Sequence, residues 1–380
     1  MSVQYLDNAA TTPVRREVLE AMTPYLTSHF GNPSSHHTVG EQAAHALADA
    51  RARVAAVLGM RATDVIFTSG ATEANNLAIK GVAIAAQQRR GARHVVTTPI
   101  EHESVLASVD YLTRIHGFEA TLVPVDATGR VDPDAVAAAI RDESAIVSVG
   151  YANNEIGTVQ DVDGLVTAVA GRVPLHLDAV QAAGWLPLNG LGADALSVAG
   201  HKIGAPKGIG ALGIRSRIPL EPVLHGGGQE RERRSGTENV AGAVGLARAL
   251  ELAEAERTDA AVRVAAMRDD LIAGVLQRVP IARLTGHPTH RLPGTASFTF
   301  AGVNGETVLL ELDRHGIITS SGSACAAGSE EASHVLLALG IDHDEARTAV
   351  RVTLGHSTTG SVAPIVDAIE AAVAAVGSGV

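Results

Sequence analysis

The chain contains a single cysteine, Cys325, within a stretch of small residues from 320 to 328. A buried cysteine usually packs among large apolar side chains, whereas Ser, Gly and Ala neighbours cannot build a core around this one. A lone thiol in such a loop suits a nucleophile or a sulfur carrier, although chance replacement of a loop alanine explains it equally well. One cysteine also excludes an intramolecular disulfide and favours a reducing, cytoplasmic location.

Lysine is rare in this chain, so the residues that could form a Schiff base are few. Lys and Arg together number 30, but the lysines are Lys80, Lys202 and Lys207 alone. Lys202 directly follows an apolar strand pattern and is surrounded by Gly, Ala and Pro, which predicts a desolvated and therefore nucleophilic amine. Lys207 lies further from the strand end, and Lys80 is predicted to end an amphipathic helix in contact with solvent.

An acidic residue and a polar turn complete a possible cofactor site. Asp178 ends the apolar segment 175–178, where a carboxylate needs a cation or a hydrogen-bond donor. The turn at 68–73 offers backbone N–H groups and hydroxyls to an anion, although taken alone it is better explained as a simple helix cap by Ser69 or Thr72. A lysine, a carboxylate and a phosphate-binding turn are the three groups that pyridoxal 5'-phosphate (PLP) requires. Their coincidence predicts a PLP site.

The elements that must position these residues alternate between helices and short apolar strands. This pattern predicts a mostly parallel sheet with helices on both faces, in which ligands bind at the carboxyl ends of the strands. Helices are expected at 41–58, from the 68–73 turn to residue 80, and at 104–116. Strands are expected at 65–68, 94–98, 120–125, 145–149, 175–178, 195–198 and 210–214.

A long helical pattern from 239 to 278 leads into a region of different organisation. There, strands are expected at 296–300 and 349–354, and helices at 306–315, 333–339 and the C-terminus. We therefore predict a large α/β domain at 15–250. Residues 1–14 and 251–380 would form a smaller α+β domain that carries the cysteine loop.

Charge and hydropathy exclude several classes of partner. The formal net charge is −11 and no basic stretch is organised like a nucleic-acid face, so direct binding of nucleic acid is not expected. No apolar run reaches the ~18 residues needed to span a bilayer, and the N-terminus carries no signal segment. A cytoplasmic protein without membrane partners is predicted, and no metal site is expected.

The ordered motifs of the chain resemble those of the cysteine desulfurases, which are PLP enzymes of fold type I. The resemblance runs from Tyr5-Leu6-Asp7 nearly to the C-terminus and is carried by many segments in the same order. They include residues 5–13, 30–35, 69–73, 101–104, 153–158, 178–181, 200–202, 225–231, 234–239 and 321–325. It implies an α/β fold with a large, mostly parallel mixed sheet flanked by helices and a smaller α+β domain.

The resemblance also implies a role for each residue of the cofactor site. Lys202 would carry PLP as a Schiff base, and His102 would stack on the ring and assist proton transfer. Asp178 would pair with the pyridinium nitrogen. The phosphate would be held by Ala71, Thr72 and His201. The phenolic oxygen or the substrate would be reached by Asn154 and Gln181.

Further residues are implied in substrate binding and assembly. Arg351 would grip the substrate carboxylate, and Cys325 would accept the sulfur of L-cysteine as a persulfide, leaving L-alanine. Thr237 would reach the phosphate of a partner subunit, which implies a homodimer. The family usually has Ser at the position of Ala199, so one phosphate contact is absent here. A surface arginine on an edge strand is the alternative for Arg351.

The sulfur would pass to an acceptor protein, with iron–sulfur cluster assembly, tRNA thiolation and cofactor thiolation all open. Selenocysteine lyase has the same fold and cofactor and is the nearest alternative activity. A fold-type I aminotransferase has no use for a loop thiol, and a non-catalytic scaffold has no use for Lys202, Asp178 and His102.

Overall fold

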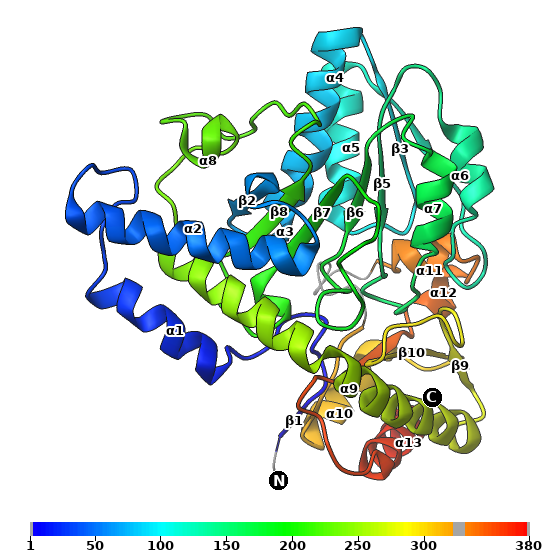
Figure 1. Ribbon diagram of the computed structural model, residues 1–380. Helices are drawn as coiled ribbons and strands as arrows, with labels where there is room; N and C mark the ends of the chain where they lie inside the picture. Colours follow the sequence, from blue (N-terminus) through cyan, green and yellow to red (C-terminus); the bar gives the residue numbers. More distant parts are fainter. Residues whose placement is uncertain (1–2, 322–330, 378–380) are drawn as a thin grey trace.

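The computed structural model describes residues 3–321 and 331–377. Cys325 lies outside the described residues. These residues form a large α/β body, at the top in Figure 1, and a smaller body below it. None of the helices in the described part of the chain combines the length and apolar character needed to span a bilayer.

The large body is built on a seven-stranded sheet with the order β2-β8-β7-β6-β5-β3-β4. Among its described strands β8 alone runs antiparallel to its neighbours, so the predicted mostly parallel sheet is confirmed. Six of the strands are nearly fully buried, as expected for a sheet covered on both faces. Their bounds are β2 Val65–Thr68, β3 His94–Thr97, β4 Glu119–Leu122, β5 Ser144–Gly150, β6 Leu175–Asp178, β7 Ala195–Ala199 and β8 Gly210–Ile214.

Strand residues alternate between two separate cores because successive side chains point to opposite faces of a sheet. Val65 and Phe67 pack with the helices of one face, whereas Ile66 between them packs with those of the other. The first face is covered by α1 (Arg16–Thr27), α2 (Thr38–Leu58), α6 (Pro133–Ala139), α7 (Val162–Val169) and the start of α9 (Val240–Arg278). The second face is covered by α3 (Ala71–Asn76), α4 (Val82–Arg90) and α5 (Glu103–His116).

One predicted helix end is wrong. Lys80 lies inside a π-helical turn, Leu77–Gly81, that joins α3 to α4 without a break. Its amine sits 4.2 Å from the centre of the Tyr111 ring, and partial burial lowers the pKa of that amine. The helix continues because its apolar face keeps packing on the sheet beyond this turn, as far as Val82 and Ala83.

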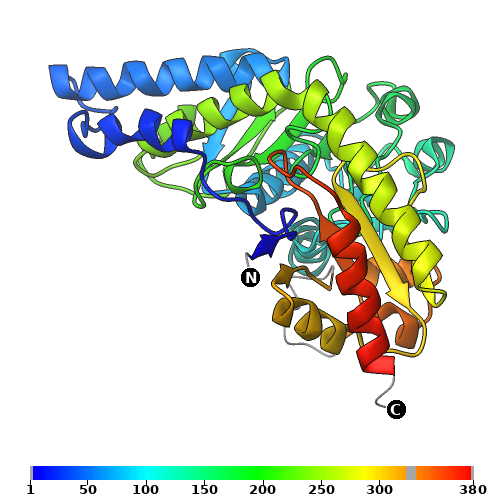
Figure 2. The same ribbon diagram turned by 90° about the horizontal axis from the view of Figure 1, so that it is seen from below.

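The smaller body has its own core around the sheet β12-β10-β9 and helices α10 and α13. Leu6 from the N-terminus and Val264, Leu271 and Val275 from the second half of α9 also pack there. Figure 2 shows α9 passing the large sheet and then running beside α13. The bounds are β1 Gln4–Tyr5, β9 Ala282–Leu284, β10 Thr295–Phe300, α10 Gly305–Arg314, β11 Ile317–Ile318, α11 His334–Ala338, α12 His343–Ala346, β12 Val350–Thr353 and α13 Ala363–Gly377.

This distribution of cores supports a division of the chain within α9, and the two-domain boundary stays a prediction. The N-terminal segment is a second link between the bodies, beside α9. Leu6 and Asp7 pair with Thr353 of β12, while Thr12 N–H donates to the carbonyl of His201 after β7.

Candidate active site

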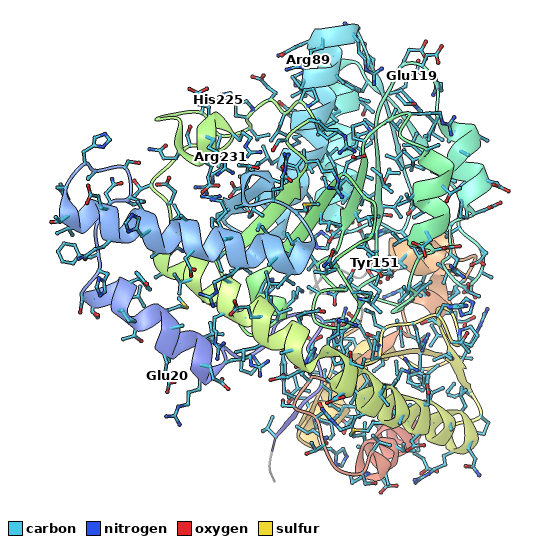
Figure 3. The ribbon with its side chains drawn as sticks, viewed as in Figure 1. Glu20, Arg89, Glu119, Tyr151, His225 and Arg231 are labelled. Atoms are coloured by element: carbon cyan, nitrogen blue, oxygen red, sulfur yellow. The ribbon has the colours of Figure 1, made fainter. Side chains whose placement is uncertain are left out.

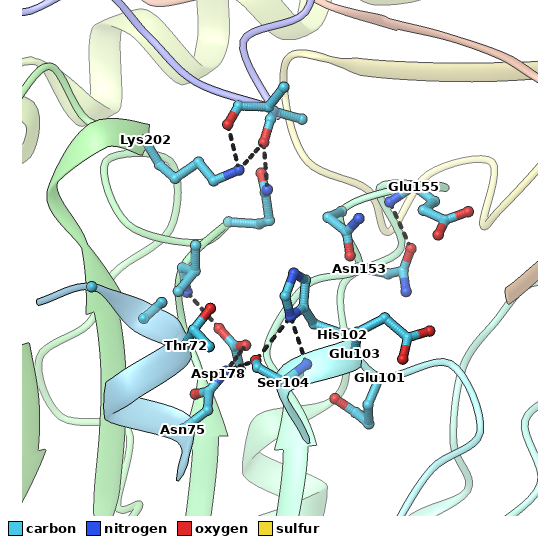
Figure 4. Close-up of a pocket in the computed structure, with 18 of the residues that line it drawn as sticks. Thr72, Asn75, Glu101, His102, Glu103, Ser104, Asn153, Glu155, Asp178 and Lys202 are labelled. Atoms are coloured by element: carbon cyan, nitrogen blue, oxygen red, sulfur yellow. Dashed lines mark hydrogen bonds between the residues drawn. The ribbon is translucent and has the colours of Figure 1, made fainter. Parts of the chain in front are cut away.

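A cavity of about 1000 Å³ lies at the carboxyl ends of β2, β3, β5, β6 and β7, where parallel sheets bind their ligands. Most of the site residues predicted from the sequence line this cavity (Figure 4). They are Ala71, Thr72, His102, Asn154, Asp178, Gln181, His201, Lys202 and Arg351.

Lys202 ends a short 3₁₀ turn, Gly200–Lys202, directly after β7. Its amine points across the cavity to the N-terminal segment and donates to the carbonyl oxygens of Ala9 and Ala10 (Figure 4). Gln181 donates from Nε2 to the same Ala9 carbonyl at 3.0 Å. The N-terminal segment therefore positions the amine even though it lies more than 190 residues away in sequence.

Asp178 is 9 % exposed at the end of β6. One carboxylate oxygen accepts from Asn75 Nδ2 at 2.7 Å, and the other accepts from the backbone N–H of Val180 at 3.0 Å. Asn75 Nδ2 also donates to Ser104 Oγ at 2.9 Å. These donors meet the requirement that a buried carboxylate be hydrogen-bonded.

His102 caps the start of α5, and its Nδ1 accepts from the backbone N–H of Ser104 at 3.0 Å. Ser104 Oγ also lies 2.8 Å from Nδ1, and it donates there because that nitrogen is an acceptor. A neutral His102 therefore carries its proton on Nε2. Asp178, Asn75, Ser104 and His102 form one hydrogen-bonded chain, which we call the cofactor floor.

The turn after β2 has the features of an anion-binding site. No side chain caps the start of α3 at Gly70, so the alternative of a simple cap by Ser69 or Thr72 is wrong. The first residues of the helix line one end of the cavity, which we call the phosphate end, and their N–H groups can bind an anion there. His201 lies at the same end, with Nδ1 3.1 Å from Thr11 Oγ1. Burial, aided by Lys202 and Lys207, lowers the pKa of His201 to about 4, so the ring is neutral near pH 7.

The opposite end of the cavity holds Arg351, which is 1 % exposed in β12. Its Nη1 donates to the carbonyl of Asn154 at 2.9 Å and its Nη2 to Asp7 Oδ1 at 2.6 Å. The alternative of a surface arginine is therefore wrong. We call Asp7, Asn154 and Arg351 the substrate end.

Two buried acids beside these groups were not selected from the sequence. Complete burial raises the pKa of Glu101 to about 8, although Thr98 Oγ1 donates to it at 2.6 Å. Burial also raises the pKa of Glu155, which accepts from Ser333 Oγ. Asn75 was missed as well. Glu101 and Glu155 stand inside motifs already noted, but nothing in the local pattern separates a buried acid from an exposed one.

Two of the predicted site residues, Thr237 and Cys325, are not among the described residues that line the cavity. Thr237 is exposed and does not line the cavity of its own chain. Cys325 is outside the described residues, but both described flanks of its loop reach the site. Ser320 pairs with the backbone of Arg351, and Ser333 and His334 line the cavity.

Comparison with known proteins identifies the family. A family model described as Aminotransferase class-V matches residues 4–361. The relative named cysteine desulfurase IscS from Methanosarcina thermophila is 46% identical over 93% of this chain and 88% of its own length. The chain belongs to the cysteine desulfurases of the class-V aminotransferase family. A solved structure of a NifS-like protein matches with a TM-score of 0.88 and 36% identity, covering 100% of this chain and 99% of that one. A structure of SspA in complex with cysteine gives 0.81 and 34%, covering 94% and 100%.

Cysteine desulfurases of this family depend on PLP, and so does this chain. The residues that line the cavity also fit PLP, independently of these comparisons. It joins a lysine amine, a buried carboxylate for a ring nitrogen and exposed helix N–H groups for a phosphate. The buried Oδ1 of Asn75 also has no hydrogen-bond partner within the described residues, which suits a site completed by a ligand.

Proposed function

We propose that this cavity removes sulfur from L-cysteine, leaving L-alanine, and that Cys325 receives the sulfur as a persulfide. The observation that carries the proposal is that Lys202, Asp178 and Arg351 line one cavity. The first two suit PLP, and the third suits the carboxylate of an amino acid. The cysteine bound in the related SspA structure agrees with this substrate.

Each side chain has a task that follows from its contacts. When bound, PLP supplies an electron sink for the bonds at the substrate α-carbon. The buried guanidinium of Arg351 binds the substrate carboxylate. Lys202 Nζ, once it leaves the carbonyls of Ala9 and Ala10, takes the proton from the α-carbon. His102 exchanges a proton at Nε2, because its Nδ1 is held by Ser104.

The sulfur step balances without an added oxidant. The Cβ–S bond of the substrate breaks, a bond forms between that sulfur and Sγ of Cys325, and Cβ gains a proton to become the methyl group of alanine. The thiolate is the attacking form of Cys325. An acceptor protein then takes the persulfide sulfur in the cytoplasm. The IscS names of relatives suggest iron–sulfur cluster assembly as one destination, beside tRNA and cofactor thiolation.

We also propose that the protein is a homodimer. Thr237 is exposed on a segment that projects beyond the edge strand β2 (Figure 1), where it can reach the phosphate end of a partner's cavity. Leu19, Leu26 and Phe30 are more than half exposed on and after α1. Large apolar side chains gathered in one segment are typical of an interface.

The variants Cys325→Ala and Lys202→Ala test the function. Cys325→Ala should keep the visible absorbance of bound PLP but release no alanine from L-cysteine, because the sulfur has no acceptor thiol. Lys202→Ala should lose that absorbance. Alanine release by Cys325→Ala would overturn the persulfide role, and its activity on selenocysteine alone would favour a selenocysteine lyase. Light scattering of wild type checks the dimer in the same preparation.

A further inference from the structure

Three consecutive residues beside the large sheet adopt an unusual backbone conformation. Glu230, Arg231 and Glu232 of α8 (Gln229–Glu232) have φ angles of 50°, 58° and 64°. For residues with a side chain this left-handed conformation is unfavourable, because the Cβ atom comes too close to the following carbonyl oxygen. Such a turn persists only where surrounding contacts impose it, and strained segments concentrate at functional sites.

Contacts with the open edge of β2 impose the turn. Glu230 is 3 % exposed, and its carboxylate accepts from both terminal nitrogens of Arg51, at 2.5 and 2.7 Å, and from the N–H of Phe67 at 3.1 Å. Arg51 and Arg231 both donate to the carbonyl of Val65, at 2.9 and 2.6 Å. Side chains therefore satisfy the backbone groups that an edge strand leaves open. Figure 3 labels Arg231 on this projecting segment.

The turn delivers Arg234 to the phosphate end of the cavity. Arg234 Nε donates to Glu73 Oε1 at 2.7 Å and Nη2 to Oε2 at 3.2 Å. Glu73 Oε2 also accepts from the N–H of Ser69 at 2.7 Å, which closes the turn between β2 and α3. The two paired side chains are only 20 % and 15 % exposed.

The Arg234–Glu73 pair has an electrostatic effect on the cavity as well as a structural one. Burial by itself would raise the pKa of Glu73, but the donors on Arg234 and Ser69 outweigh burial and lower it. The carboxylate is therefore charged, and it lines the same cavity end as Ala71 and Thr72. Without the guanidinium it would repel a phosphate placed there.

We propose that Arg234 is a positioning residue for the cofactor phosphate. Through Glu73 it holds the Ser69–Glu73 turn in shape, and it neutralises the carboxylate of Glu73. Arg234 lies three residues before Thr237 on the same segment, so the same ion pair also ties the segment proposed to reach the partner subunit to the Ser69–Glu73 turn. This inference rests on the proposed function, because it requires PLP in this cavity.

The test compares PLP with pyridoxal, which has the same ring and aldehyde but no phosphate. Apo forms of wild type and Arg234→Gln are titrated with each compound and followed by visible absorbance. Arg234→Gln should raise the Kd of PLP about 10- to 100-fold, the factor for one or two charge-assisted hydrogen bonds. The Kd of pyridoxal should stay unchanged. Replacing Glu73 by Gln in the Arg234→Gln background should recover part of the PLP affinity, because the repulsion is removed.

Arg53→Gln is the matched control. Arg53 also makes a two-pronged pair, with Glu251 at 2.7 and 2.6 Å, between α2 and α9, and neither residue lines the cavity. Its PLP affinity should equal that of wild type. If Arg234→Gln does not fold, Arg234→Lys is used instead, because it keeps the positive charge but cannot form the two-pronged hydrogen bonds of a guanidinium. It should lose less affinity for PLP than Arg234→Gln and should also leave the affinity for pyridoxal unchanged.

If Arg234→Gln loses as much affinity for pyridoxal as for PLP, Arg234 has only a general structural role and the proposal is overturned. Unchanged PLP affinity would overturn it as well. If wild type itself binds no PLP, the proposed function fails, which is a different result from either of these.

Discussion

The two ends of the cavity are assembled in different ways. The cofactor floor comes from the end of β6, from α3 and from the start of α5, all packed on the large sheet within a span of about a hundred residues. At the substrate end, Asp7 and Arg351 are 344 positions apart and meet where the N-terminal segment pairs with β12. The floor is therefore part of one packed body, whereas the substrate end depends on how two bodies and a linking segment fit together.

This contrast assigns the two binding properties of the enzyme to different parts of the molecule. Changes in the floor should act on cofactor binding and leave the substrate affinity of the loaded enzyme intact. Changes at the substrate end should act on the KM for cysteine and on the stability of the contact between the bodies. Two experiments test whether the two ends are separate in this way, and a third tests the protonation of a buried acid beside them.

The largest effect is expected from Arg351→Gln. Truncating one partner of a buried charge pair costs about 2–5 kcal/mol, so we expect the KM for L-cysteine to rise about 100-fold. The Tm should fall too, because Asp7 loses its cation. The double variant Asp7→Asn/Arg351→Gln should recover the Tm but not the KM, measured by alanine release and by thermal unfolding. Arg314→Gln, in an exposed pair with Glu311, is the control. Recovery of KM in the double variant would contradict this view of the substrate end.

Asn75→Leu should have a smaller effect, confined to the cofactor. Its amide is the donor that joins Asp178 to Ser104, and losing one buried hydrogen bond to a charged group costs about 1.5–3 kcal/mol. We expect the Kd of PLP to rise at least about 10-fold. The KM for cysteine, measured with PLP in excess, should not change. A rise in KM instead would show that the floor and the substrate end are not separate.

The smallest effect is a change in pH dependence from Glu101→Gln. The native carboxyl keeps its proton up to about pH 8, whereas an unfolded Glu loses it near pH 4.5. The unfolded state therefore binds fewer protons between these values, and the free energy of unfolding contributed by Glu101 falls as pH rises from 4.5 to 8. Urea unfolding at pH 6 and pH 8 should show a weaker decline in the variant than in wild type. The substitution can also change stability equally at both pH values, and this comparison is not affected by such a change. If the free energy of unfolding falls by the same amount between pH 6 and pH 8 in the variant and in wild type, Glu101 is not a buried, protonated acid.

The amino-acid sequence was enough to place the local elements and most residues of the site. Each strand of the large sheet was predictable within a few residues, and α9 begins after its cap Asn239 and ends at Arg278 as expected. Helices α1, α6, α7, α8 and α12 and the short strands β1, β9 and β11 were not predicted. All of these except α1 are short elements that carry too few periodic residues. Lys202 and Asp178 were predictable because a polar group directly after an apolar strand must lie at the sheet's ligand-binding edge.

Which distant groups meet depends on the tertiary fold. No spacing predicts that the carbonyls of Ala9 and Ala10 receive the Lys202 amine, or that Asp7 holds Arg351, because these contacts join segments that are adjacent only after the chain has closed on itself. Asn75 looks like an ordinary helical amide until α3 is placed against β6 and α5. Local patterns record which side chains must be buried, but the partner that satisfies each buried polar group is set by packing between elements.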